Sequence, residues 1–191
     1  MTFTQAAFGA DTLLKKTLLV VAGTIFIAIA AQISIPFFPV PMTLQTLAIL
    51  AVGLAFGARL GAVTLLAYLA EGAAGLPVFA NGGAGLAYMA GPTLGFLIGF
   101  VGMAYIAGLA AGRGFVAMLV ASLVAAAFIY LPGLAWPLGV ANAFGIEAGW
   151  AGLSAEKVFA GFATPFLLGD AVKALLAAML VSGAFKALRK S

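Results

Sequence analysis

The sequence predicts an all-α integral membrane protein with six transmembrane helices, in one domain covering residues 1–191. Two observations support this fold class: 65% of the residues are hydrophobic, and only 7% are charged. A water-soluble domain of this length needs more charge to cover its surface. The apolar runs are continuous and rich in Ala, Leu and Gly, which favours helices over the alternating strands of a membrane β-barrel.

The first half of the chain divides into three expected spans. The first runs from about Leu13 to Ile35 and ends at segment 36–41, where three prolines in six residues cannot continue a helix. The second covers about Met42–Phe56, and the third covers about Leu60–Ala73. Both are shorter than the roughly 20 residues that a straight span needs. We therefore expect each to extend into a loop or to line a cavity.

Three more spans are expected in the second half. The fourth covers about Pro92–Ala111, with its proline in a first-turn position. The fifth covers about Gly114–Leu131 and is expected to end at Pro132-Gly133. A long connection over residues 132–163 then leads to the sixth span, about Thr164–Leu188.

The basic residues predict the orientation of these spans. With six spans, both termini and the loops at Arg59 and Arg113 fall on one side, together with most other Lys and Arg residues. The positive-inside rule makes this side the cytoplasm. Loops 36–41, 74–91 and 132–163 are then outside. Basic residues that stand in ones and twos between apolar runs do not indicate a nucleic-acid partner; the expected surroundings are the lipid bilayer.

Two charged residues, Asp170 and Lys173, fall inside the expected sixth span. They are three positions apart and therefore share one face of a helix. A charge in lipid is costly, so such residues normally face the bundle interior or a water-filled cavity. The pair is either a structural ion pair that holds the sixth span to its neighbours or the polar centre of a binding site.

A few polar residues share the outer side of the membrane with this pair. Thr43 and Gln45 open the second span, while Asn81 and Tyr88 belong to a Gly-rich loop. Each of them alone is more often a cap or loop residue than a ligand contact. Together they indicate a substrate-binding pocket that opens outward, with aromatic walls and loops as its cover.

The sequence also limits the chemistry that is expected. There is no Cys and no His, which removes thiol chemistry, His-containing metal sites and His general bases, and no metal or cofactor is expected. No phosphate-binding Gly-rich motif of the Walker A type is present, so ATP hydrolysis would need partner subunits. A proton-coupled secondary transporter that uses Asp170 as a proton relay is an alternative function, and an intramembrane enzyme is a third.

Several segments, in order along the chain, resemble BioY proteins, the substrate-binding S components of energy-coupling factor (ECF) biotin transporters. They are P-V-P-M-T-L-Q-T-L at 39–47, G-A-A-G-L-P-V-F at 72–79, G-P-T-L-G-F at 91–96, Y-L-P-G at 130–133 and P-F-L-L-G-D-A-V-K at 165–173. The resemblance covers almost the entire chain.

The resemblance implies an ECF S-component fold with an outward-facing biotin site in a bacterial cytoplasmic membrane. It implies that Asp170, Lys173 and Asn81 contact the fused ureido ring of biotin, which is the transported ligand and not a cofactor. It also implies two kinds of partner, a transmembrane T component and a pair of ABC-type ATPases. An S component for another vitamin is the runner-up within transport, and Asn81 and the Asp–Lys spacing argue against it.

Overall fold

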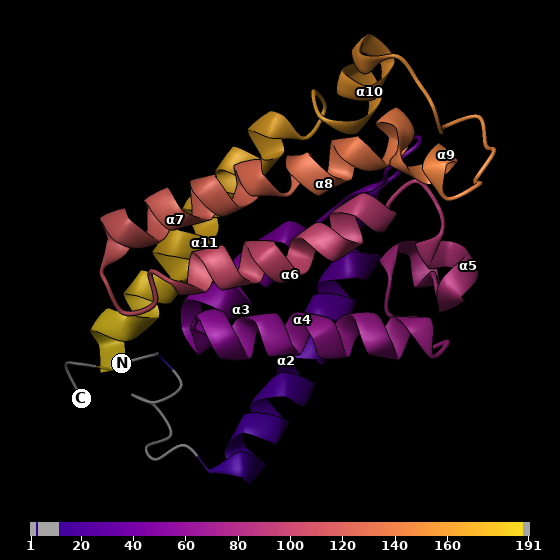
Figure 1. The fold of residues 1–191 in the computed structure, drawn as a ribbon. Helices are drawn as coiled ribbons and strands as arrows, with labels where there is room; N and C mark the ends of the chain where they lie inside the picture. Colours follow the sequence, from indigo (N-terminus) through magenta and orange to yellow (C-terminus); the bar gives the residue numbers. More distant parts are fainter. Residues whose placement is uncertain (1–2, 4–11, 189–191) are drawn as a thin grey trace.

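Long helices run side by side through the body of the protein, while short elements gather toward one end (Figure 1). The computed structural model describes Phe3 and residues 12–188. Within this part of the chain α6 is the central helix, because it packs against α3, α4 and α7. The main helices are α2 (Leu13–Gln32), α3 (Gln45–Phe56), α4 (Ala58–Ala73), α6 (Leu94–Gly108), α7 (Phe115–Phe128), α8 (Tyr130–Ala135) and α11 (Leu167–Leu188).

The short elements form connections between these helices. The remaining described elements are β1 (Ser34–Ile35), β2 (Met42–Thr43), η1 (Ala80–Gly82), α5 (Gly85–Met89), η2 (Trp136–Val140), α9 (Ala141–Ala143) and α10 (Ala155–Phe162). The two strands pair antiparallel, with Ser34 opposite Thr43 and Ile35 opposite Met42. This pairing closes the proline-containing loop 36–41 into a hairpin.

Several helix ends differ from the sequence prediction. The expected second span begins at Met42, but α3 starts only at Gln45 because Met42 and Thr43 are engaged in the β1–β2 pairing. The expected fourth span opens with Pro92, whereas this proline lies in a turn before α6, and the amide of Leu94 donates to the carbonyl of Gly91. In both cases backbone groups that would have formed helical hydrogen bonds are bonded in a local turn or strand instead.

The predicted end of the fifth span at Pro132-Gly133 is wrong. A continuous helical segment runs from Phe115 to Ala143, and α8 begins at Tyr130 directly after α7. Pro132 lies in the first turn of α8, directly after α7 ends at Phe128, so it interrupts the interior of neither helix. The connection over residues 132–163 therefore begins with helix, and it also contains α10.

The surface of the bundle is apolar in the manner of a membrane protein. Three helical segments of the described chain are long and apolar enough to cross a bilayer: Leu13–Gln32, Phe115–Ala143 and Leu167–Leu188. Large apolar side chains point outward from them, such as Leu168, which is 79% exposed. Only a lipid environment makes such exposure favourable along whole helices. The protein is therefore an α-helical membrane protein.

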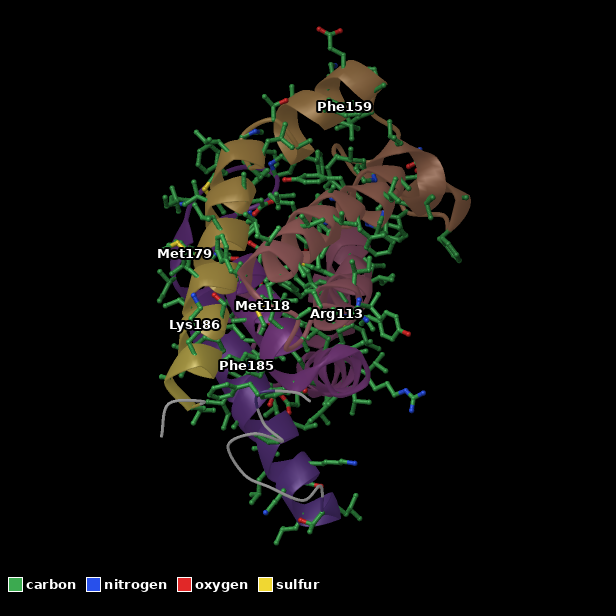
Figure 2. All side chains as sticks on the ribbon, turned by 90° about the vertical axis from the view of Figure 1, so that its left-hand side faces the viewer. Arg113, Met118, Phe159, Met179, Phe185 and Lys186 are labelled. Carbon is green, nitrogen blue, oxygen red and sulfur yellow. The ribbon has the colours of Figure 1, made fainter. Side chains whose placement is uncertain are left out.

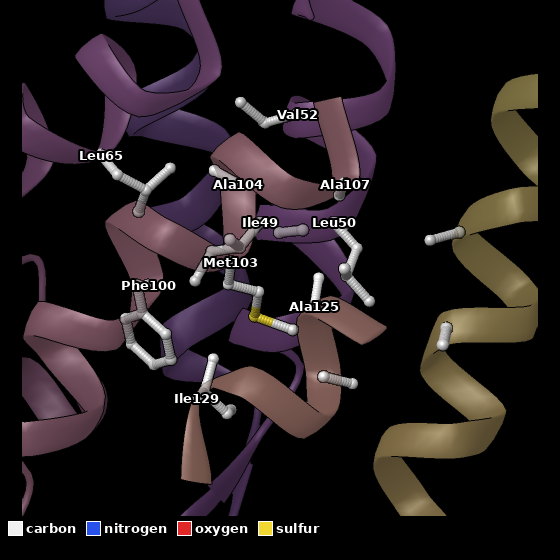
Figure 3. Packing of buried hydrophobic residues seen from close by; sticks show 14 of the residues in the cluster. Ile49, Leu50, Val52, Leu65, Phe100, Met103, Ala104, Ala107, Ala125 and Ile129 are labelled. Carbon is white, nitrogen blue, oxygen red and sulfur yellow. The ribbon is translucent and has the colours of Figure 1, made fainter. Parts of the chain in front are cut away.

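Small residues allow the helices around α6 to approach closely. Gly53 of α3 faces the backbone of α6, and a Cβ atom there would lie 2.5 Å from the carbonyl oxygen of Ala104. Around this contact Ile49, Leu65 and Met103 are fully buried (Figure 3). Close packing of small residues is a main source of helix association in membranes. The same two helices line the cavity described below.

We predict that Gly53→Ala destabilises the protein, because the added methyl group meets backbone that cannot rotate away. Overpacking of this kind costs about 1–3 kcal/mol. The midpoint of thermal unfolding in detergent measures the effect. Gly183→Ala is the matched control, since Gly183 also lies within a helix but a Cβ there meets nothing within 4 Å. Equal midpoints for the two variants would contradict this account of the α3–α6 contact.

Candidate ligand-binding site

A cavity lies among α3, α6, α8 and α11, beneath the loops that contain Val40 and Tyr88. The space between its walls, counted out to its mouth, is about 580 Å³. The polar lining residues are Thr43, Gln45, Thr46, Tyr88, Thr93, Tyr130, Asp170 and Lys173, and the apolar ones are Val40, Pro41, Ala80, Phe96, Leu97, Phe100, Ile129 and Phe166.

The carboxylate of Asp170 is the centre of the polar wall. Lys173 Nζ forms an ion pair with Asp170 Oδ1 at 3.2 Å. The hydroxyl of Thr46 donates to the same oxygen at 3.1 Å, and the hydroxyl of Tyr130 donates to Oδ2 at 2.7 Å. Asp170 is only 5% exposed and Lys173 only 8%. Donors from α3, α8 and α11 thus meet on one buried carboxylate.

The local sequence explains why the carboxylate lies at this point. Its amide donates to the carbonyl of Phe166, within the first turn of α11. A negative charge is favoured there, because the N-terminal end of a helix carries partial positive charge. Lys173 follows three residues later on the same helix face, within reach of the carboxylate. The expected helix-face geometry of the pair is thus realised.

The pair keeps hydrogen-bonding capacity for a ligand. A carboxylate offers about four acceptor positions, and three donors of the described chain occupy three of them. An ammonium group carries three donors, and among the described residues Lys173 uses one of them, on Asp170. One acceptor position on Oδ2 and two donors on Nζ thus remain for a molecule in the cavity.

A second group of hydrogen bonds links the cavity to loop 74–91. The hydroxyl of Thr43 donates to Gln45 Oε1 at 3.4 Å, and Gln45 Nε2 donates to the hydroxyl of Tyr68 at 2.7 Å. Tyr68 is fully buried and donates in turn to the carbonyl of Val78 at 2.7 Å. Gln45 therefore lines the cavity with its amide already held in one orientation.

Tyr88 closes the aromatic side of the cavity. Its ring stacks on Phe79 with centroids 5.2 Å apart, and Phe79 packs edge-on against Tyr68 at 5.5 Å. Gly83 leaves room for the Tyr88 ring, because a Cβ there would overlap it. Burial raises the pKa of the Tyr88 hydroxyl, partly offset by its hydrogen bond with Thr93. The phenol is therefore protonated at neutral pH and able to donate.

Asn81 lies beside the cavity but is not part of its lining. It adopts a left-handed backbone conformation with φ of 57°, which asparagine tolerates better than most residues. Its side chain is exposed, and Asn81 Oδ1 accepts a hydrogen bond from Ser34 at 2.8 Å. The structure thus brings five of the six predicted site residues to one cavity and places Asn81 at the loop that covers it.

Thr46 and Tyr130 are not among the site residues predicted from the sequence. Thr46 follows Gln45 directly in the sequence. Because the second span was expected to start at Met42, the face of α3 on which Thr46 lies could not be deduced. Tyr130 belongs to the Y-L-P-G segment, which was interpreted as the end of a span rather than the start of α8. Both residues carry a hydroxyl group near the outer end of an expected span, and this is the signal that points to them.

The whole chain resembles proteins of a known family. A sequence model described as the BioY family matches residues 4–190. The chain belongs to the BioY family. The biotin transporter BioY of Rhizobium etli is 38% identical over 169 residues, covering 87% of this chain and 89% of that protein. A probable biotin transporter BioY of Pyrococcus horikoshii is 37% identical over 166 residues, covering 87% and 93%.

A solved structure extends the BioY relationship to the fold. It is a crystal structure of the S-component for biotin from an ECF-type ABC transporter. The two chains superimpose with a TM-score of 0.74 at 26% identity, over 95% of this chain and 96% of that one. The structure thus confirms a mostly helical protein with the fold of an ECF S component. The family is one of transporters, which rules out the intramembrane-enzyme interpretation.

Removing one partner of the Asp170–Lys173 pair should destabilise the folded protein. We predict that Lys173→Met lowers the free energy of unfolding by about 3 kcal/mol, because it leaves a buried carboxylate without its counter-charge. The double variant Asp170→Leu/Lys173→Met should recover most of this loss, since no isolated charge remains. Chemical or thermal unfolding in detergent measures both. A double variant as unstable as Lys173→Met would show that the charges themselves are not the cause.

Proposed function

We propose that the chain is the biotin-binding S component of an ECF-type ABC transporter and captures biotin from the extracytoplasmic side. The observation that carries the proposal is the buried Asp170–Lys173 pair, which lines a cavity and keeps free acceptor and donor capacity. A purely structural pair would gain by satisfying that capacity within the protein. The names of the BioY relatives and of the superimposed S component agree with this ligand.

The chemistry of biotin matches these groups. Its fused ureido ring carries two N–H donors and one carbonyl acceptor. The remaining acceptor position on Asp170 Oδ2 suits one N–H, and the free donors of Lys173 suit the carbonyl. Hydrogen bonds to charged groups are stronger than those between neutral ones, which favours tight binding in a buried site.

The rest of the vitamin would lie along the other walls. Phe96, Phe100 and Phe166 provide apolar surface for the sulfur-containing ring and the aliphatic chain. The carboxylate of biotin would point toward the cavity mouth, where the protonated hydroxyl of Tyr88 and backbone amides of the Gly-rich loop are the nearest expected donors. Asn81 would reach the ureido ring only after its loop shifts, since Asn81 Oδ1 is held by Ser34.

The proposed topology places six spans in a bacterial cytoplasmic membrane, formed by α2, α3, α4, α6, the α7–α9 segment and α11. Arg113 and Lys186 lie toward one end of the bundle, and Phe159 of α10 lies toward the other (Figure 2). The positive-inside rule assigns the end with Arg113 and Lys186 to the cytoplasm. The expected cytoplasmic position of both termini concerns residues outside the part of the chain that the structure describes. The cavity, near α10, then opens outward.

Release of biotin into the cell would require partners. The chain has no phosphate-binding motif, so the energy for release would come from a transmembrane T component and ABC-type ATPase subunits. A proton-coupled secondary transporter is the alternative, because Asp170 is a buried carboxylate in contact with the cavity. The alternative predicts that Asp170 changes protonation during each cycle.

We predict that Asp170→Asn weakens biotin binding at least tenfold, because an amide loses the ion pair with Lys173 and accepts hydrogen bonds through one atom only. Isothermal titration calorimetry on the purified protein measures this. Glu156→Gln is the control, since it removes an exposed carboxylate in α10, outside the cavity lining. If Asp170→Asn bound biotin as tightly as the Glu156 variant, the site assignment would be refuted.

Uptake in cells separates the two energy sources. We expect that biotin accumulation continues when an ionophore collapses the proton gradient while cellular ATP is maintained, and stops when ATP is depleted. Radiolabelled biotin in a biotin-auxotrophic host that expresses the chain with its ATPase module measures this. The reverse pattern would favour the proton-coupled alternative.

A further inference from the structure

A second hollow, on the outer surface of the bundle, also reaches Asp170. It is a groove between α7–α8 on one side and α11 on the other, with α10 at one end. Counted out to its mouth, it encloses about 690 Å³. Tyr130 and Asp170 line both this groove and the central cavity. The two hollows therefore meet at a common pair of side chains.

A single hydrogen bond joins this pair across the boundary. The hydroxyl of Tyr130 donates to Asp170 Oδ2 at 2.7 Å, which links α8 to α11. Elsewhere α7 packs closely along α11, but its continuation α8 does not. Helices α8 and α11 separate toward α10 (Figure 1). Between α8 and α11, the side chain of Tyr130 therefore separates the groove from the central cavity.

The groove itself is mainly apolar, and a row of alanine side chains, called the alanine lane below, runs along it. Ala127 of α7 and Ala171 of α11 are exposed on opposite walls, and Ala126 and Ala163 lie deeper. Phe159 and Leu167, both more than half exposed, stand at its rim. Because these residues belong to the lipid-facing surface of the bundle, the groove opens toward the bilayer and not toward bulk water.

The cover at the end of the cavity is held much more firmly. Gln32 Nε2 donates to the carbonyl of Phe79 at 3.0 Å, and the amide of Gly82 donates to Gln32 Oε1 at 2.9 Å. Ser34 and Tyr68 bind the same covering loop through Asn81 and Val78. Displacing this loop breaks these four hydrogen bonds and the edge-on contact of Phe79 with Tyr68. Rotation of Tyr130 breaks one hydrogen bond and its edge-on contact with Phe96.

We propose that the groove between α8, α10 and α11 is a lateral entrance to the central cavity, with the Tyr130–Asp170 hydrogen bond as its gate. An amphiphilic ligand reaches the cavity from the outer interface of the bilayer, its apolar part following the alanine lane. The proposal rests on the proposed function, since it takes biotin as the ligand.

The depth of the entrance suits such a ligand. Asp170 lies three residues after the start of α11, roughly 5 Å along the helix axis. This is near the level where amphiphilic molecules collect at a membrane surface. Biotin combines a polar ring with an aliphatic arm and so belongs to this class. Its ring meets the carboxylate of Asp170 at the inner end of the groove, and Lys173 beyond it in the central cavity, without first crossing the covering loop.

Rate measurements test the entrance separately from the site. Ala127→Trp and Ala171→Trp each place an indole in the groove, and neither alanine lines the central cavity. Ala70→Trp is the control, because Ala70 is exposed on α4 and lines neither hollow. The association and dissociation rates of a fluorescent biotin derivative and of unlabelled biotin as competitor are measured with the protein in phosphatidylcholine nanodiscs.

If the groove is the route, both groove variants slow association and dissociation by the same factor, at least fivefold, while the equilibrium dissociation constant and the Ala70→Trp rates stay unchanged. Equal slowing follows because entry and exit use one path. Unchanged rates in both groove variants would overturn the proposal and point to entry through the covering loop, as would a weaker affinity without equal slowing. Failure of the unmodified protein to bind biotin would refute the proposed function instead.

Discussion

The buried carboxylate of Asp170 is the constraint on which the rest of the site depends. Thr46, Tyr130 and Lys173 donate to it from α3, α8 and α11, so that one charged group connects three helices. An unpaired charge at this depth would be prohibitively costly, and each donor removes part of that cost. The same donors leave room for one more hydrogen bond at Oδ2. Stability and ligand binding thus use the same atoms, and the two interpretations that the sequence left open are not exclusive.

Much of the fold could be predicted because lipid imposes a simple rule on the sequence. Long apolar runs must become helices, and the positions of α2, α4 and α11 follow closely from their lengths and breaks. The errors lie at residues whose type is compatible with two different local structures. Pro132 signals a helix end in most contexts, yet it occupies the first turn of α8. Met42 appears apolar enough for a span, yet its backbone pairs with Ile35.

Two features of the site could be predicted from the sequence: its charged residues, and the polar residues expected on the same side of the membrane. Asp170 and Lys173 stood out because the expected topology gave them no place in water, and Thr43, Gln45 and Tyr88 share their cavity. The covering loop was harder, because Asn81 takes a left-handed conformation that turns its amide toward Ser34. Tyr130 lies inside the expected fifth span, but its role depends on which way its side chain faces at the end of that span, which tertiary packing decides and local pattern does not.

The most direct test of the central claim is a crystal structure of the protein saturated with biotin. The account predicts that the ureido carbonyl lies within hydrogen-bond distance of Lys173 Nζ and that a ring N–H donates to Asp170 Oδ2, with Thr46 still bound to Oδ1. A biotin whose ureido ring lies elsewhere, with Asp170 and Lys173 bonded only within the protein, would contradict it.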